Sequence, residues 1–178
     1  MKSVSIDAKT LLKRSLLSAV SITVAVTLPW LCHLLGGAMG LGSGLGEMLL
    51  PMHLPVMLAG LLWGYQVGFV AGLVSPLASF ALTGMPGAMM LPFITVELAV
   101  YGLTAGLPSR MKMPTLGKVV LVQVAGRAVR ALALAVAIYG FGFAGLPMSI
   151  VWTSITAGAV GILLQWVLVP ALCREAKR

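Results

Sequence analysis

Charged residues are scarce in this chain. They make up 9% of its 178 residues, whereas a soluble domain carries about 25%. Hydrophobic residues reach 60%, and the mean hydropathy is +1.06. This balance excludes a soluble globular protein and indicates an all-α integral membrane protein, in which lipid rather than water surrounds the helices. No hydrophilic stretch is long enough for a second domain. We therefore expect a cytoplasmic segment at 1–10, one transmembrane domain at 11–172 and a basic cytoplasmic tail at 173–178.

Cysteines and catalytic motifs are equally sparse. Cys32 and Cys173 are the only cysteines, and the topology expected below puts them on opposite sides of the membrane, so no disulfide or metal site is expected. The glycine-rich segment 36–47 lacks the G-x-x-x-x-G-K-[ST] motif of a nucleotide-binding loop. No Ser/His/Asp or metal-ligand set is recognisable. We expect no enzymatic activity, no metal and no cofactor held by this chain.

The apolar stretches predict six membrane-spanning helices. A single helix over the charge-free stretch 48–83 would be about 54 Å long, against a hydrocarbon core of about 30 Å, so we divide it at the turn 63–66. The expected spans are 11–35, 50–62, 67–83, 90–107, 119–139 and 148–172. The first span has no small-residue cleavage site at its end, which predicts a retained helix rather than a signal peptide.

Positive charge predicts the orientation of these spans. Ten lysines and arginines lie at one set of span ends: around the start of the first span, between the fourth and fifth, and after the sixth. They are Lys2, Lys9, Lys13, Arg14, Arg110, Lys112, Lys118, Arg174, Lys177 and Arg178. The positive-inside rule makes this side cytoplasmic. We expect a multi-pass protein of the cell membrane with both termini inside.

The fourth expected span contains Glu97, a rare carboxylate in a chain with only four acidic residues. A charge at such depth costs roughly 2.5–3.5 kcal/mol on insertion scales, so it marks a functional site or half of a buried pair. Arg127 and Arg130 lie on one face of the fifth span. Arg130 should lie about 17 Å below the cytoplasmic surface and Glu97 about 10 Å below the outer one. In a core of about 30 Å these depths nearly coincide, which predicts a pair of Glu97 with Arg130 or Arg127.

Two arginines against one glutamate leave one positive charge over. An anionic group of a ligand could neutralise it, because a planar guanidinium holds a carboxylate at two points. The alternative is that the second arginine bonds backbone carbonyls or reaches water in a cavity. Glu97, Arg127 and Arg130 are therefore candidate substrate-binding residues.

Other candidates lie near the outer surface. His53, close to the outer end of the second span, is either a hydrogen-bonded packing residue or a ligand-binding one. Trp30, Tyr139 and Trp152 form either an ordinary aromatic belt or a stacking wall for a ring-bearing ligand. We include all four as candidate substrate-binding residues.

Small residues recur at helical spacing in two places. Gly60, Gly64, Gly68 and Gly72 follow one another every fourth residue, which predicts close packing of helix backbones. In the first span, Ser15, Ala19, Thr23 and Thr27 form a stripe, with Ser21 and Ala25 beside it. Such a stripe could serve a partner protein, and the candidate residues for this contact are Ala19, Ser21, Thr23 and Ala25.

The segment 53–107, HLPVMLAGLLWGYQVGFVAGLVSPLASFALTGMPGAMMLPFITVELAVYGLTAGL, resembles the substrate-binding (S) components of energy-coupling factor (ECF) transporters. The later VAGRAV is similar to their fifth-helix Gly-Arg motif. The resemblance implies a six-helix bundle that captures a small water-soluble vitamin or cofactor precursor on the outer side, under the loop joining the first two helices. A transmembrane coupling (T) protein and two ATPases, which use the ATP, would complete the importer. The first-span stripe would match the coupling surface, with Ser21-x-x-x-Ala25 or Ala19-x-x-x-Thr23 replacing the usual Ala-x-x-x-Ala.

Two other functions remain open at this point. A self-sufficient proton-coupled carrier could use Glu97 as a relay, although the inverted repeats that usually mark such carriers are not recognisable. A structural assembly factor would bind no small molecule.

Overall fold

The computed structural model of the protein describes residues 7–42, 44–107, 113–143 and 145–176. Within these ranges every regular element is a helix, which confirms the expected all-α class. The elements are α1 (Ala8–Ala38), α2 (Gly44–Leu49), α3 (His53–Trp63), α4 (Tyr65–Thr83), α5 (Leu91–Gly106), α6 (Thr115–Ala135), the π-helical turn η2 (Val136–Gly140), α7 (Ile150–Ala157) and α8 (Ala159–Glu175).

Not every expected span is long enough to cross a membrane alone. Among the described residues, four helical units are long and apolar enough: Ala8–Ala38, Gly44–Trp63, Tyr65–Thr83 and Thr115–Gly140. α7 and α8 meet the same criterion only as a pair, bent by 53°, and α5 is shorter, with 16 residues. Each expected span coincides with a helix or a helix pair, while the number of crossings and their orientation stay predictions.

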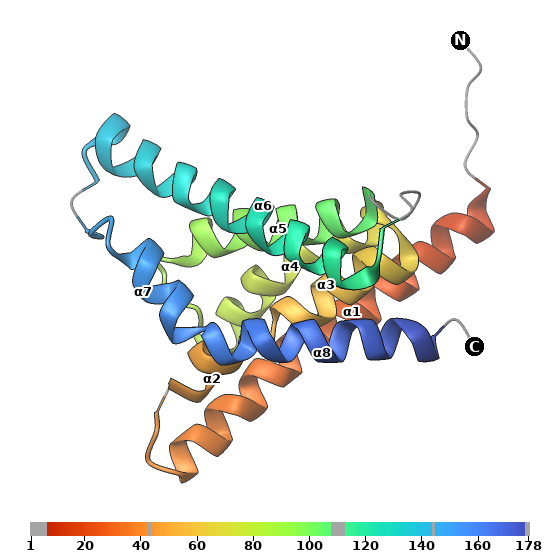
Figure 1. Cartoon of the computed structure of the whole chain (residues 1–178), viewed down its shortest axis with the longest axis horizontal. Helices are drawn as coiled ribbons and strands as arrows, with labels where there is room; N and C mark the ends of the chain where they lie inside the picture. The colour runs from red at the N-terminus through yellow and green to blue at the C-terminus, as the bar shows by residue number, and fades with distance from the viewer. Residues whose placement is uncertain (1–6, 43, 108–112, 144, 177–178) are drawn as a thin grey trace.

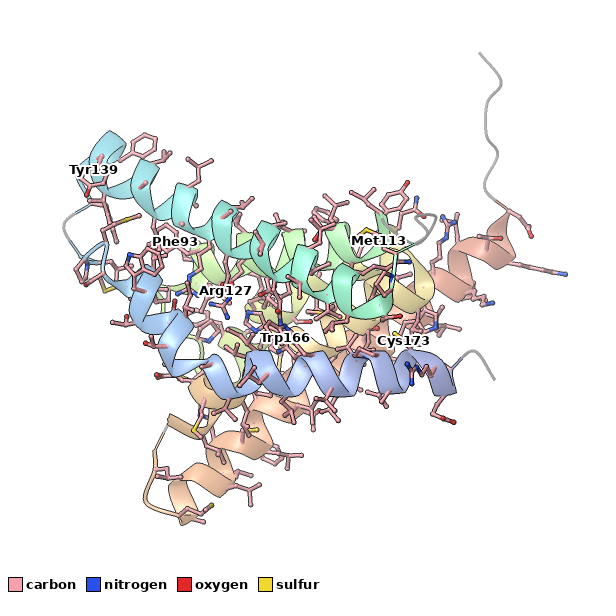
Figure 2. The ribbon with its side chains drawn as sticks, viewed as in Figure 1. Phe93, Met113, Arg127, Tyr139, Trp166 and Cys173 are labelled. Carbon is pink, nitrogen blue, oxygen red and sulfur yellow. The ribbon has the colours of Figure 1, made fainter. Side chains whose placement is uncertain are left out.

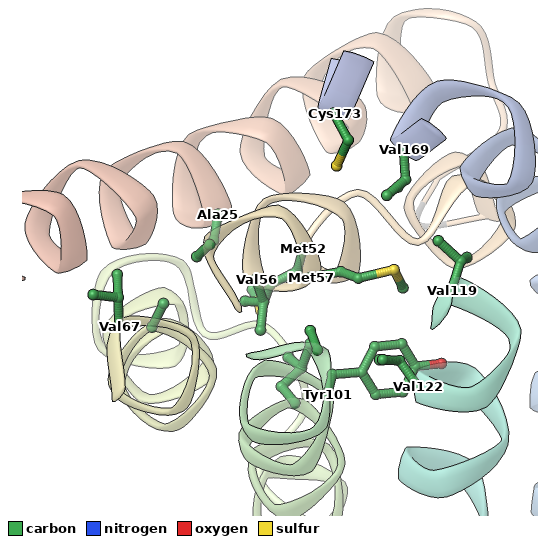
Figure 3. Close-up of a cluster of buried hydrophobic side chains, with 14 residues drawn as sticks. Ala25, Met52, Val56, Met57, Val67, Tyr101, Val119, Val122, Val169 and Cys173 are labelled. Carbon is green, nitrogen blue, oxygen red and sulfur yellow. The ribbon is translucent and has the colours of Figure 1, made fainter. Parts of the chain in front are cut away.

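Figure 1 shows how these helices are arranged. α6 and α8 lie on the viewer's side of α3, α4 and α5, and α7 leads from the end of η2 into α8. α1 passes behind the bundle, and its C-terminal end extends away from it together with the segment that leads to α2. The buried hydrophobic cluster in Figure 3 draws on six helices and includes Met57, Tyr101, Val122 and Val169. Both cysteines are free.

Glycines let α3, α4 and α5 pack backbone against backbone. A Cβ placed on Gly102 of α5 would collide with the Gly68 carbonyl of α4, and one on Gly72 would collide with the Leu98 carbonyl. A Cβ on Gly60 of α3 would likewise meet the Gly102 carbonyl, at 2.5 Å. This is the close packing that the four-residue glycine spacing predicts.

Gly64 has a different role from the other glycines of that stripe. It lies between α3 and α4 with a φ of 97°, a left-handed angle that an L side chain rarely adopts. The chain therefore reverses inside the stretch 63–66, where span length predicts a turn.

α1 packs along α3 and α4, and this contact corrects part of the expected partner surface. Ser21 and Ala25 are 3% and 0% exposed, and Figure 3 shows Ala25 beside Val56 of α3. Both small residues are buried by the chain's own bundle, so they are not available to a partner protein. Ala19 and Thr23 lie on the other face of α1 and are exposed.

Candidate functional site

A buried ion pair joins α5 to α6. Glu97 is 0% exposed, and its Oε2 accepts a hydrogen bond of 2.9 Å from Nη1 of Arg130. The Arg130 side chain is 11% exposed, so the guanidinium is the half of the pair that reaches open space. The pair predicted from span depth is thus formed, with Arg130 rather than Arg127.

His53, the first residue of α3, approaches the same carboxylate. Its Nε2 lies 3.7 Å from Oε1 of Glu97, which is too long for a hydrogen bond. Neither ring nitrogen of His53, nor that oxygen, has a hydrogen-bond partner among the described residues. Buried polar atoms usually have partners, so atoms of this kind mark a place where a ligand or water atom is expected.

Tyr101 positions the His53 ring, and Gly126 makes room for Tyr101. The two rings meet edge to face with centroids 5.0 Å apart. A Cβ on Gly126 of α6 would collide with the Tyr101 ring. In the Gly126-Arg127 motif, the first residue therefore permits the close contact between α5 and α6.

Part of the Arg127 guanidinium also lacks a hydrogen-bond partner among the described residues. The residue is half-buried, and the nitrogens concerned are Nε and Nη2. It lies within electrostatic reach of Glu97 and of the Tyr101 hydroxyl. Figure 2 shows it in the interior, between α6 and the α7–α8 pair.

A glutamine network on the same face of α6 was not predicted. Nε2 of Gln123 donates to Oε1 of Gln165 on α8 at 3.0 Å, and Nε1 of Trp166 donates to Oε1 of Gln123 at 2.7 Å. Gln123 and Gln165 are 5% and 1% exposed. The signal was present in the sequence, because Gln123, Arg127 and Arg130 are spaced four and three residues apart and share one helix face.

A cavity of about 500 Å³ opens beside the ion pair. It lies among α1, α2, the start of α3, α4, the turn 85–90, α5, α6 and α7, and its walls are mainly apolar. The polar side chains on its wall are His33, Glu47, His53, Ser79, Arg130, Thr153 and Ser154. Of the predicted substrate-binding residues, His53 and Arg130 line it, whereas Glu97 supports Arg130 from the protein side and Arg127 is not part of the wall.

His33 and Glu47 were not predicted as cavity residues. His33 lies on α1, and a Cβ on Gly46 of α2 would come within 2.9 Å of its ring. Glu47, on α2, is exposed. α2 lies in the glycine-rich segment and contacts α1, α7 and α8. A six-residue helix is too short to show a periodic pattern, so the sequence does not predict that α2 packs against these helices.

The predicted aromatic wall is not part of this cavity. Trp30, Trp152 and Tyr139 are 48%, 72% and 76% exposed, and none of them lines it. Successive residues of a helix point about 100° apart, so the neighbours Pro29 and Thr153 take the inward positions instead. Figure 2 shows Tyr139 on η2, at the far left of the view. A stacking role in this cavity therefore has no support from the geometry, and the aromatic-belt interpretation stays a prediction.

These features define an all-helical membrane protein with a small-molecule-sized cavity and a charged group at its wall. The family model described as "ECF transporter, substrate-specific component" matches residues 9–173, so the chain belongs to this family. The match confirms the resemblance carried by 53–107 and VAGRAV. Neither the curated proteins nor the solved structures give a match. Membership implies a small-molecule substrate and action together with a T component and ATPases, and the family is one of transporter subunits rather than enzymes.

Proposed function

We propose that the chain captures a small water-soluble vitamin or cofactor precursor at the outer side of the cell membrane, as the substrate-binding subunit of an ECF-type ABC importer. The cavity of about 500 Å³ carries this proposal. Small-molecule sites are typically concave and apolar, with a few converging polar groups and volumes of about 300–1,000 Å³. Here His53 and Arg130 supply the polar groups, and Glu97 holds the Arg130 guanidinium in place before a ligand arrives.

Delivery to the cytoplasm is assigned to partner subunits. A transmembrane coupling protein and two ATPases would use ATP, so this chain needs no nucleotide site. The exposed Ala19 and Thr23 of α1 are candidates for the contact with the coupling protein, because small residues let two helices approach closely.

Native mass spectrometry of the purified chain tests ligand capture. We expect one small molecule bound per chain, released on denaturation. Arg174→Gln, which removes a positive charge at an exposed site in the last turn of α8, should retain the bound molecule. A chain that carries no small molecule after growth in rich medium, and binds none from a medium extract, would contradict the proposal.

Transport by proteoliposomes separates an importer subunit from a proton-coupled carrier that uses Glu97. The structure offers no specific support for the carrier, since Glu97 is 0% exposed and one of its oxygens is held by Arg130. We expect uptake to require the coupling protein, the ATPases and ATP, and to continue when a protonophore collapses the proton gradient. Uptake by this chain alone that stops with the protonophore would support the carrier instead.

A further inference from the structure

The charges near the cavity suggest which kind of substrate it accepts. The four acids of the chain are Asp7, Glu47, Glu97 and Glu175. Asp7 precedes α1, Glu47 is an exposed residue of α2 and Glu175 ends α8, so Glu97 is the acid that belongs to the charged group on α5 and α6. In that group one carboxylate, Glu97, faces two guanidinium groups, Arg127 and Arg130.

The same group has more free donors than free acceptors. Among the described residues, buried nitrogens without a hydrogen-bond partner are Nε of Arg130, Nε and Nη2 of Arg127, and both ring nitrogens of His53. One His53 nitrogen carries a hydrogen in the neutral ring, which makes four unused donors. Oε1 of Glu97 and the second His53 nitrogen are the corresponding unused acceptors. An anion with several acceptor atoms would neutralise the extra positive charge and accept hydrogen bonds from the unused donors.

We propose that the substrate is a small monocarboxylate that binds with its carboxylate toward Arg130 and His53; this inference rests on the proposed function. One carboxylate matches the single surplus charge, and its two oxygens match the fork of a guanidinium. A phosphate monoester carries about 1.5 to 2 negative charges at neutral pH and would exceed that surplus.

The remaining walls of the cavity limit the rest of the molecule. They are mainly apolar and include Met52, Met90 and Ile94. Burying a second charged group against them without a partner would be costly. The substrate therefore has one acidic head and an uncharged remainder.

The experiment compares the molecule released from the purified chain with its methyl ester. Acidic methanol should add one methyl group to that molecule, which counts its carboxyl groups. Ligand-free protein in nanodiscs should bind the acid at least about 30-fold more tightly than the ester, because the ester cannot neutralise a buried charge. Arg130→Gln should remove most of this preference, and Arg130→Lys, which keeps the charge without the fork, should remove part of it. Arg174→Gln should leave it unchanged.

The outcomes separate this inference from the proposed function. A released molecule with no carboxyl group, two carboxyl groups or a phosphate would overturn the inference and leave the importer role standing. Equal binding of acid and ester to the unmodified chain would overturn it as well. The comparison of acid and ester on the unmodified chain and on Arg130→Lys tests the inference even if Arg130→Gln does not fold. A chain that holds no small molecule at all contradicts the proposed function itself.

Discussion

Replacing Arg130 by glutamine should destabilise the protein far more than replacing Arg130 and Glu97 together. In the single variant, Oε2 of Glu97 loses its 2.9 Å contact while the carboxylate remains at 0% exposure. Removing one side of a buried pair costs about 3–5 kcal/mol, because an uncompensated charge stays inside. In a chain of this length, about 1 kcal/mol corresponds to about 2–4 °C. The melting temperature should therefore fall by about 6–20 °C.

The reverse single variant should be milder. Glu97→Gln leaves an unpaired guanidinium, but the Arg130 side chain is 11% exposed and lines the cavity, where water can reach it. We expect a loss of about 1–3 kcal/mol for this unpaired donor. The double variant leaves two amides that can hydrogen-bond to each other, so it should lie within about 1 kcal/mol of the unmodified protein.

Thermal unfolding measures these differences in stability. Ligand-free protein carrying Cys32→Ser, so that Cys173 is its one thiol, is heated with a thiol-reactive fluorophore. Cys173 is 4% exposed, so its reaction reports unfolding. Arg174→Gln controls for the loss of a positive charge elsewhere. If the double variant lost as much as the two single variants combined, Glu97 and Arg130 would not be energetically coupled, and the interpretation of the pair would be refuted.

Two further predictions concern helix packing and are read from the same melting curves. Gly102→Ala places a Cβ against the Gly68 carbonyl and should lower the free energy of unfolding by about 1–3 kcal/mol. The control Gly37→Ala, at a helical glycine whose Cβ would have nothing within 4 Å, should not lower stability. Equal melting temperatures of the two variants would argue against backbone contact between α4 and α5. Trp166→Phe removes the donor to Gln123 and should lower the free energy of unfolding by about 0.5–1.5 kcal/mol. The control Trp152→Phe, at a side chain that is 72% exposed, should leave stability nearly unchanged. The same small effect in both variants would show that the glutamine network does not stabilise the fold.

Much of the helical framework could be predicted, because span length and local chemistry determine it. The stretch 48–83 is too long for one crossing, and Gly64 provides the reversal where that argument puts it. The pair of Glu97 with Arg130 follows from the depth of two charges in a layer of known thickness. Neither inference needs knowledge of how a helix is turned about its own axis.

The rotation of the helices could not be predicted, and most corrections come from it. A soluble helix reveals its buried face by an apolar stripe, but in lipid nearly every face is apolar. Ala19 and Ser21 therefore looked equivalent, although only Ser21 is buried. For the same reason the sequence could not decide whether Trp152 belongs to an aromatic belt or to the wall of a ligand site. Polar residues are the exception, since burying Gln123 requires a partner, and its helical spacing from Arg127 was a usable signal.

The cavity could not be predicted because it depends on tertiary contacts between short elements. Two glycines allow close contacts here. A Cβ on Gly161 of α8 would meet the carbonyl of Leu49, the last residue of α2, at 2.5 Å, and a Cβ on Gly158, between α7 and α8, would meet the Leu50 side chain at 2.8 Å. The 53° bend between α7 and α8 falls at Gly158. Glycines in an apolar segment predict close packing but not its partner, so the contribution of α7 to the cavity wall was not foreseen.

The ratio of one glutamate to two arginines is itself consistent with a binding site. Without Glu97, α6 would carry two uncompensated charges into the membrane, each costly to insert. With a second acid beside it, the group would be neutral and would have nothing left with which to attract an anion. The single carboxylate of Glu97, which accepts a 2.9 Å hydrogen bond from Arg130, lowers the cost of burying the two guanidinium groups and leaves one positive charge at the site. Glu97 is then best understood as a residue that positions Arg130, because its own carboxylate is buried behind the guanidinium and is not part of the cavity wall.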